Sequence, residues 1–108
     1  MNHRERMLAG LPYLANQDGL LESRMAAQEL LYTYNNLPPQ RWEEQRGLLE
    51  QLLGGIGENS TILPPLRCDY GKHIVVGRDV FTNDNLTILD VCQFTIGDRP
   101  IIGPNVSI

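Results

Sequence analysis

The feature that most constrains the fold of this chain is a six-residue repeat that runs through its second half. From Ile62 onward, steps that alternate between two and four residues select mostly apolar side chains. The selected positions are Ile62, Pro64, Cys68, Tyr70, Ile74, Val76, Val80, Thr82, Leu86, Ile88, Cys92 and Phe94. After Phe94 the register slips by two residues, and the same steps select Ile96, Pro100, Ile102, Val106 and Ile108.

This pattern indicates short strands that are separated by turns. Side chains alternate between the two faces of a strand, so a pair of inward side chains followed by a gap is typical of a straight segment and a corner. Three such segments make one coil of a parallel β-helix with a triangular cross-section and about eighteen residues per coil. Gly77, Gly97 and Gly103, with the Asp and Asn residues beside them, fall at the expected corners, where a tight turn or a positive φ is needed.

The first half of the chain has a helical pattern. Asn2 with Glu5 predicts the start of a short helix, and Gly10 predicts its end. A second helix is predicted from an N-cap at Asp18 to about Tyr34. Its apolar face is expected to contain Leu21, Met25, Leu30 or Leu31, and Tyr34.

A third helix is predicted after Pro38 and Pro39, hairpinned against the second. Its apolar face is expected to contain Trp42, Leu49, Leu52 and Leu53, with Gly54 and Gly55 at its end. We therefore predict an α+β chain with a helical segment over residues 1–58. Over residues 59–108 we predict the start of a β-helix, about two and a half coils long.

Charge and composition argue against several classes of partner. The net charge is −4 and the nine Lys and Arg residues are scattered, so we expect no binding to nucleic acid. No signal peptide or long apolar run is present, which predicts a cytoplasmic protein that does not enter a membrane. Cys68 and Cys92 lack the spacing of a metal or redox motif, so we expect no metal site, and we expect both thiols to be reduced and unpaired.

Several stretches resemble the start of a known enzyme family. They are "RCDYG", "GRDVFTNDNLTILDVCQFTIGD" and "GPNVSI", together with the helical residues from "ERMLAG" to "LLYTYN". In order and nearly without gaps, they are similar to the maltose O-acetyltransferases and the related galactoside O-acetyltransferases. The resemblance implies a left-handed hexapeptide β-helix, a homotrimer with acetyl-CoA bound between neighbouring prisms, and acetyl transfer from CoA to a sugar hydroxyl.

The resemblance also suggests where the reaction would take place. The general base of the family is a His that follows the "GPNV" repeat, and this chain ends at Ile108 before reaching it, so no catalytic residue is expected within it. His73 and His3 do not match that position, and we interpret both as surface residues. Residues that match the acceptor side of the family site, or lie near its expected cleft, are Asn83, Phe81, Asp69 and Asp90.

Simpler interpretations stand beside these. Asp69 and Asp90 have the residue type that often caps a corner, and Tyr70 and Cys92 fall at inward steps typical of core. An acidic residue that the galactoside enzymes use in the helical segment corresponds to Ala15, which puts a galactoside acceptor in doubt. The chain is alternatively a truncated, non-catalytic scaffold or sugar-binding module, or the same fold acting on a non-sugar acceptor.

Overall fold

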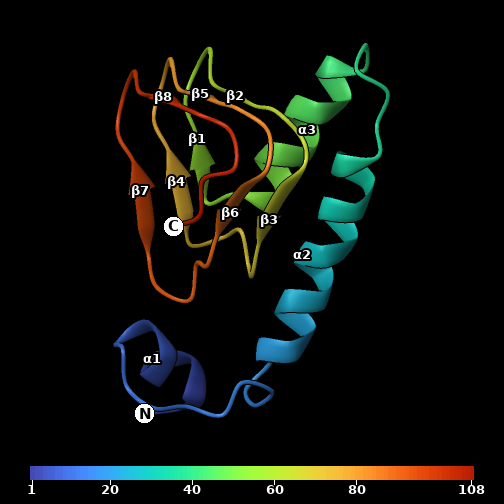
Figure 1. Cartoon of the computed structure of the whole chain (residues 1–108). Helices are drawn as coiled ribbons and strands as arrows, with labels where there is room; N and C mark the ends of the chain where they lie inside the picture. The colour runs from blue at the N-terminus through green and yellow to red at the C-terminus, as the bar shows by residue number, and fades with distance from the viewer.

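A computed structural model describes all 108 residues of the chain. Three helices precede eight short strands, as Figure 1 shows. The helices are α1 (His3–Leu8), α2 (Leu20–Asn35) and α3 (Trp42–Leu52). The strands are β1 (Gly55–Ile56), β2 (Thr61–Ile62), β3 (Leu66–Cys68), β4 (Ile74–Val76), β5 (Phe81–Thr82), β6 (Leu86–Ile88), β7 (Phe94–Ile96) and β8 (Ile101–Ile102).

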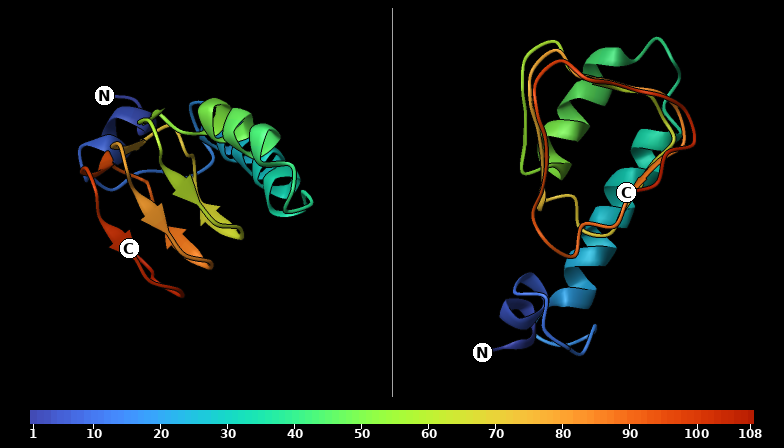
Figure 2. Two further views of the ribbon diagram at one scale, coloured as in Figure 1. Left: turned by 90° about the horizontal axis from the view of Figure 1, so that it is seen from above. Right: turned by 60° about the vertical axis from the view of Figure 1, so that its left-hand side comes forward.

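The strands form three parallel sheets, with the orders β1-β4-β7, β2-β5-β8 and β3-β6. Seen along the stack, the chain runs round a roughly triangular path whose successive turns overlie one another (Figure 2, right). From β1 to β5, each strand pairs with the strand three places further along the chain. This arrangement confirms the parallel, three-sided packing that the six-residue repeat predicts.

The repeat length, however, is 20 residues and not the predicted eighteen. Gly55 pairs with Val75, Leu66 with Leu86, and Phe81 with Ile101, and each pair differs by 20 positions. The two extra residues lie in the corner between the third sheet and the first, because β3 ends at Cys68 and β4 begins only at Ile74. The sequence pattern revealed this slip after Phe94 but concealed its earlier occurrence after Cys68.

The missed slip misplaced the first inward positions. Leu66 is fully buried although the predicted steps skip it, whereas Pro64 is only half-buried. Cys92 is also only half-buried, because the later slip lies between β6 and β7 and thus before Phe94. From Ile74 to Ile88 the predicted inward residues are buried, and the apolar ones form one core with Leu31 of α2 and Leu49 of α3. The left-handed backbone at the corners is adopted mainly by Asp and Asn, as predicted, and not by Gly77, Gly97 and Gly103; the residues are Asn59, Asp79, Asn85, Arg99 and Asn105.

The short first helix forms as predicted, but the second one begins differently. Asn2 and Glu5 make a reciprocal capping box at the start of α1. The N-cap of α2 is Gly19 in a left-handed conformation, and the carboxylate of Asp18 instead accepts a hydrogen bond of 2.6 Å from the N–H of His3. Asp18 therefore ties the loop before α2 to the start of α1.

The buried face of α2 also differs from the predicted one. Leu20, Ala27, Leu31 and Tyr34 are buried, while Leu21 and Met25 are exposed. In α3, Leu49 and Leu52 are buried as predicted, but Trp42 is exposed. The two helices pack as a hairpin against the first strands, with α2 on β3 and α3 on β1.

Side chains of α2 and α3 cover the free edges of β1, β2 and β3 with hydrogen bonds. Asn35 pairs with both backbone groups of Leu66, donating to its carbonyl and accepting from its N–H at 2.9 Å each. Three further side chains donate to edge carbonyls: Gln28 to Cys68 at 3.0 Å, Tyr34 to Ile62, and Arg46 to Gly57 and Ile56 at 3.0 and 3.2 Å. We call this set of contacts the helical cap.

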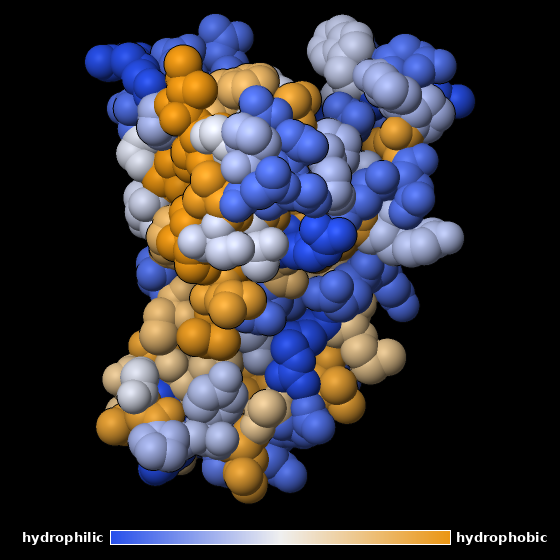
Figure 3. All heavy atoms as spheres, in the orientation of Figure 1, coloured by the Kyte–Doolittle hydropathy of each residue, from blue (hydrophilic) through white to orange (hydrophobic).

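The opposite edge of the stack is not covered in this way. Strands β7 and β8 are the outer strands of their sheets, on the side away from α2 and α3 (Figure 2, left). Figure 3 looks onto this side and shows hydrophobic atoms gathered over the last strands. Ile101 is 82% exposed and Ile108 45% exposed.

None of the helices is sufficiently long and apolar to span a membrane.

Candidate functional site

The corner between β3 and β4 is built around one buried carboxylate. Asp90 follows β6 in the next coil and is 0% exposed. Its Oδ1 accepts hydrogen bonds from the N–H groups of Asp69 and Tyr70, both at 2.9 Å, and its Oδ2 accepts from the N–H of Gly71 at 2.7 Å. The alternative interpretation of Asp90, a residue that caps a corner, therefore describes its contacts in this structure.

Gly71 closes this corner from the other side. Its φ is +79°, and a Cβ built there would lie 2.5 Å from Cδ1 and 2.6 Å from the carbonyl oxygen of Leu52. Only glycine combines this backbone conformation with so close an approach. The segment from Asp69 to Gly71 is thus held between the end of α3 and the Asp90 carboxylate, and we call it the clamped corner.

Asp69 is the half-buried carboxylate of the clamped corner. It contributes its backbone N–H to Asp90. Burial raises the pKa of Asp69, the nearby charge of Asp90 raises it further, and the charge of Arg24 acts in the opposite direction. A half-buried carboxylate whose pKa is shifted by burial and by neighbouring charges is a candidate functional group.

Arg24 is the residue of this site that the sequence analysis missed. From the first half of α2, its Nη1 donates to the carbonyl of Ala15 at 2.5 Å and to the hydroxyl of Tyr70 at 3.0 Å. Its Nη2 donates to the side chain of Asn16. A single Arg on a helix, 46 residues from Tyr70, carries no sequence signal for such a contact.

Phe81 and Asn83 lie elsewhere. Phe81 is on the outer side of β5, 36% exposed, and Asn83 is half-buried at the corner that follows this strand. The side-chain oxygen of Asn83 accepts from the N–H of Asp84 at 2.9 Å. The structure thus joins Asp69 and Asp90 at one corner and puts Phe81 and Asn83 at a different corner of the triangular coil.

The two histidines are both engaged in contacts. Nδ1 of His3 accepts from the N–H of Leu14 at 3.0 Å. His73 is half-buried, with its Nδ1 2.6 Å from the carbonyl oxygen of Asp90 and its ring 5.1 Å from that of Tyr70. Cys68 and Cys92 are free thiols. No group of three or more His, Cys, Asp and Glu side chains is arranged to hold a metal ion.

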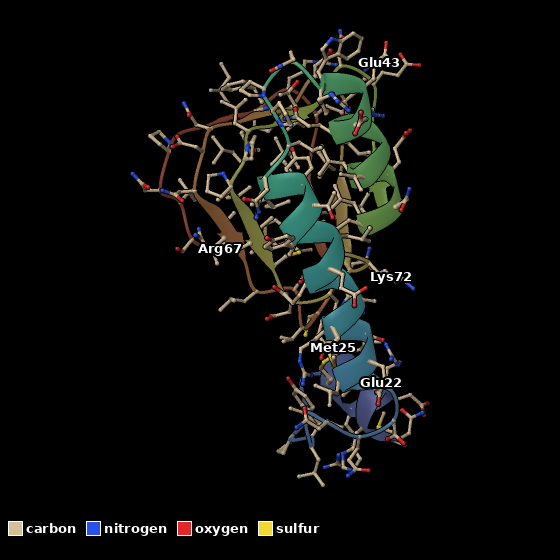
Figure 4. The ribbon with its side chains drawn as sticks, turned by 90° about the vertical axis from the view of Figure 1, so that its right-hand side faces the viewer. Glu22, Met25, Glu43, Arg67 and Lys72 are labelled. Carbon is tan, nitrogen blue, oxygen red and sulfur yellow. The ribbon has the colours of Figure 1, made fainter.

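A hollow of 410 Å³ lies between the helices and the end of the clamped corner. Its walls include Arg4, Tyr70, Lys72 and His73. Figure 4 shows Lys72 and Glu22, another wall residue, on the side of α2 on which α3 lies, with Met25 on the other side. None of the four predicted site residues lines this hollow, but Tyr70 of the clamped corner does, so the hollow borders the candidate site on the side of the helices.

Comparison with known sequences gives consistent matches over the whole chain. The model of the maltose acetyltransferase hexapeptide capping motif matches residues 6–57. Galactoside O-acetyltransferase of Escherichia coli (strain K12) is 36% identical over 104 residues, which are 96% of this chain and 51% of that protein. Nodulation protein L of Rhizobium leguminosarum bv. viciae is 39% identical over 107 residues, which are 99% of this chain and 56% of that protein.

Solved structures give the same result. A maltose O-acetyltransferase from Clostridium difficile 630 superposes with a TM-score of 0.96 at 36% identity, over 99% of this chain and 57% of that one. A galactoside acetyltransferase in complex with coenzyme A has a TM-score of 0.95 at 36% identity, over 99% and 54%. The chain spans about half the length of the relatives that it matches.

Proposed function

We propose that this chain, which belongs to the family of maltose and galactoside O-acetyltransferases, forms the acceptor-side portion of an enzyme that acetylates a sugar. The donor would be acetyl-CoA and the acceptor a hydroxyl of a sugar such as maltose or glucose. The observation that carries this proposal is the superposition of 99% of the chain on a maltose O-acetyltransferase, with a TM-score of 0.96. The coenzyme A complex of a galactoside acetyltransferase supports the donor.

The reaction would require a general base and hydrogen-bond donors that stabilise the oxyanion. The acceptor hydroxyl oxygen attacks the thioester carbonyl carbon, the new C–O bond forms, and the C–S bond breaks as the oxyanion collapses. A general base takes the hydroxyl proton, which then passes to the sulfur of the departing CoA. By family resemblance this base is a His beyond residue 108, and we assign no catalytic residue within the chain.

We assign the acceptor to the outer surface of the coils. Asp69, on which the charge of Arg24 acts, supplies a carboxylate at the clamped corner, and Asn83 supplies an amide at a different corner, two residues after Phe81 of β5. Carboxylate, guanidinium and amide groups suit sugar hydroxyls, which both donate and accept hydrogen bonds. Ala15 stands where the galactoside branch has an Asp, so we favour maltose or glucose over a galactoside.

The same resemblance supports further features of the complete protein. We propose a left-handed β-helix, of which this chain contains about two and a half coils. We also propose a division between the helical segment and the coils near residue 58, a homotrimer with acetyl-CoA between neighbouring prisms, and a cytoplasmic location. Strand β1 (Gly55–Ile56) lies just before this division and already pairs with β4.

The proposal is tested by following CoA release from acetyl-CoA with the complete protein that carries this chain. We expect turnover with maltose or glucose, and none with residues 1–108 alone. Acetyl transfer to a non-sugar hydroxyl, with no transfer to any sugar, would support the alternative in which the same fold acts on a non-sugar acceptor. A stable protein that releases no CoA with any acceptor tested would favour the scaffold or sugar-binding alternative.

Site variants make the test residue-specific. Asp69→Asn and Asn83→Ala should each raise the acceptor KM by on the order of tenfold, because a hydrogen bond to a desolvated polar group is lost. Asp79→Asn is the matched control, since Asp79 is exposed at a left-handed corner that Asn also tolerates. An unchanged acceptor KM in both site variants would contradict the assignment.

A further inference from the structure

Asp90 has no free face with which to contact a ligand. It is fully buried, and its two carboxylate oxygens receive three backbone N–H groups from the clamped corner. Its own carbonyl oxygen is 2.6 Å from Nδ1 of His73. A carboxylate in this position is a fixed structural anchor, in contrast to Asp69, which is half-buried and engages Asp90 through its backbone N–H.

We propose that Asp90 is a positioning residue of the acceptor site, which holds the clamped corner so that the carboxylate of Asp69 is presented to the acceptor. This inference rests on the proposed function. It replaces the sequence-based assignment of Asp90 as a direct sugar contact by an action through Asp69.

The corner needs such an anchor for a physical reason. Between Cys68 and Ile74 the chain leaves the ladder of β3 and β6, so the N–H groups of Asp69, Tyr70 and Gly71 have no strand partner. Buried N–H groups that lack an acceptor are costly, and one carboxylate satisfies all three. The N–H of Asp69 is among them, so the position of this residue depends directly on Asp90.

The other side of the corner is blocked as well. A Cβ at Gly71 would lie 2.5 Å from Cδ1 of Leu52, so only glycine lets the corner pack this closely against the end of α3. Asp90 stands 20 positions after Tyr70, so the repeat length puts it under the corner of the preceding coil. The stacking of one coil on the next therefore fixes the geometry of the site, and a separate loop is not needed.

The sharpest test is Asp90→Asn in the complete protein, alone and combined with Asp69→Asn. Asn has the same shape but offers one acceptor oxygen, and its NH₂ group would face a backbone N–H. We expect the acceptor KM to rise on the order of tenfold while the acetyl-CoA KM stays unchanged. Once Asp69 is already Asn, the same change at Asp90 should have little additional effect, because the two residues act as a unit.

Asp98→Asn is the matched control. The carboxylate of Asp98 also accepts a backbone N–H from the preceding coil, that of Arg78 at 3.1 Å, but at an exposed corner of another sheet. Asp98→Asn should leave the acceptor KM and the acetyl-CoA KM unchanged. If the effects of Asp90→Asn and Asp69→Asn on the acceptor KM simply multiply in the double variant, the positioning role is wrong. It is also wrong if Asp90→Asn impairs acceptor use, acetyl-CoA use and the circular dichroism signal of folded protein to the same extent.

Hydrogen exchange separates this inference from the proposed function. The amides of Asp69, Tyr70 and Gly71 should exchange faster in Asp90→Asn than in wild type or in Asp98→Asn. Unchanged exchange would overturn the clamp even in an active enzyme. If the wild-type protein acetylates no sugar, the proposed function and the positioning role fail together, while faster exchange would still identify Asp90 as the anchor of this corner.

Discussion

The two edges of the strand stack are made of the same kind of segment but end differently. At the first edge, β1, β2 and β3 meet the helical cap, in which side chains of α2 and α3 bond to strand carbonyls and to one strand N–H. At the other edge, β7 and β8 pair on one side only, and Ile101 and Ile108 are exposed. An unpaired strand edge invites association with other chains, so it needs a covering element.

The difference shows what the helices contribute. They do more than add apolar area, because Asn35 replaces a missing strand at Leu66, while Gln28 bonds to one edge carbonyl and Arg46 to two. The clamped corner also depends on α3, through Leu52. The cap therefore stabilises the first coil and holds one side of the candidate site in place.

The largest expected effect comes from breaking the cap at its two-bond contact. Asn35→Ala leaves the N–H and the carbonyl of Leu66 without partners, which should lower the free energy of unfolding by about 2–4 kcal/mol. Urea unfolding measures this change. Asn36→Ala is the control, because Asn36 bonds within an exposed helix end, and equal losses in both variants would mean that the edge contact has no special role.

The next effect concerns a thiol beneath the cap. Burial, followed by the charges of Asp90 and Asp69, raises the pKa of Cys68 from 9.0 to about 12. The Cys68 thiol ionises at a lower pH in the unfolded chain than in the folded one. Its contribution to the free energy of unfolding is therefore complete below pH 9 and is lost as the pH rises toward 12. The loss should be on the order of 2 kcal/mol at about pH 11.

Two cysteine variants isolate this effect. Cys68→Ala should reduce the slope of unfolding free energy against pH between 9 and 12, whereas Cys92→Ala should retain it. Cys92 is only half-buried, so it should also react first with a thiol reagent in the native protein. Faster modification of Cys68 than of Cys92 would show that the cap opens readily.

A smaller effect on stability is expected in β5, which lies between β2 and β8. The hydroxyl of Thr82 is buried without a hydrogen-bond partner. Thr82→Val should therefore raise the free energy of unfolding by about 1 kcal/mol, measurable as a higher melting temperature. Thr61→Val, at an exposed position of β2, should change little. A loss of stability in Thr82→Val would mean that the hydroxyl has a partner in solution.

The smallest effect is expected at the uncovered edge. Ile101 lies in register with Phe81 but is 82% exposed, so Ile101→Thr should change the free energy of unfolding by less than about 0.5 kcal/mol. Thermal melting measures the change. A destabilisation as large as that of Asn35→Ala would show that this edge is covered in solution, and the comparison between the two edges would then fail.

Most of the strands could be predicted from the sequence, because a two-plus-four pattern of apolar residues is compatible with few folds besides a stack of short strands. The pattern conceals the slip at Cys68 because Pro64 and Leu66 are both apolar, and either register fits it. The same ambiguity between neighbouring residues gave Leu21 in place of Leu20 on α2. The local pattern predicts Asp18 as the N-cap of α2, because its contact with His3 depends on how the loop between the two helices folds back.

The candidate site was less accessible to sequence reasoning. Asp69 and Asp90 stood out as carboxylates in the resembling motifs, but their different roles depend on burial and on three hydrogen bonds across coils. Arg24 and the side chains of the helical cap act on partners 8 to 46 residues away. Such contacts follow from tertiary packing and leave no local pattern.

The 20-residue register also limits how proteins of this shape can change in length. An insertion of one whole coil would keep every inward side chain facing inward and every strand beside its partner. An insertion of an odd number of residues within a strand would turn the following side chains away from the core, and a shorter even-numbered one would shift later strands along their partners. Gene duplications and deletions in this half of the chain should therefore be tolerated in units of one coil, while single-residue changes in length should be confined to the corners.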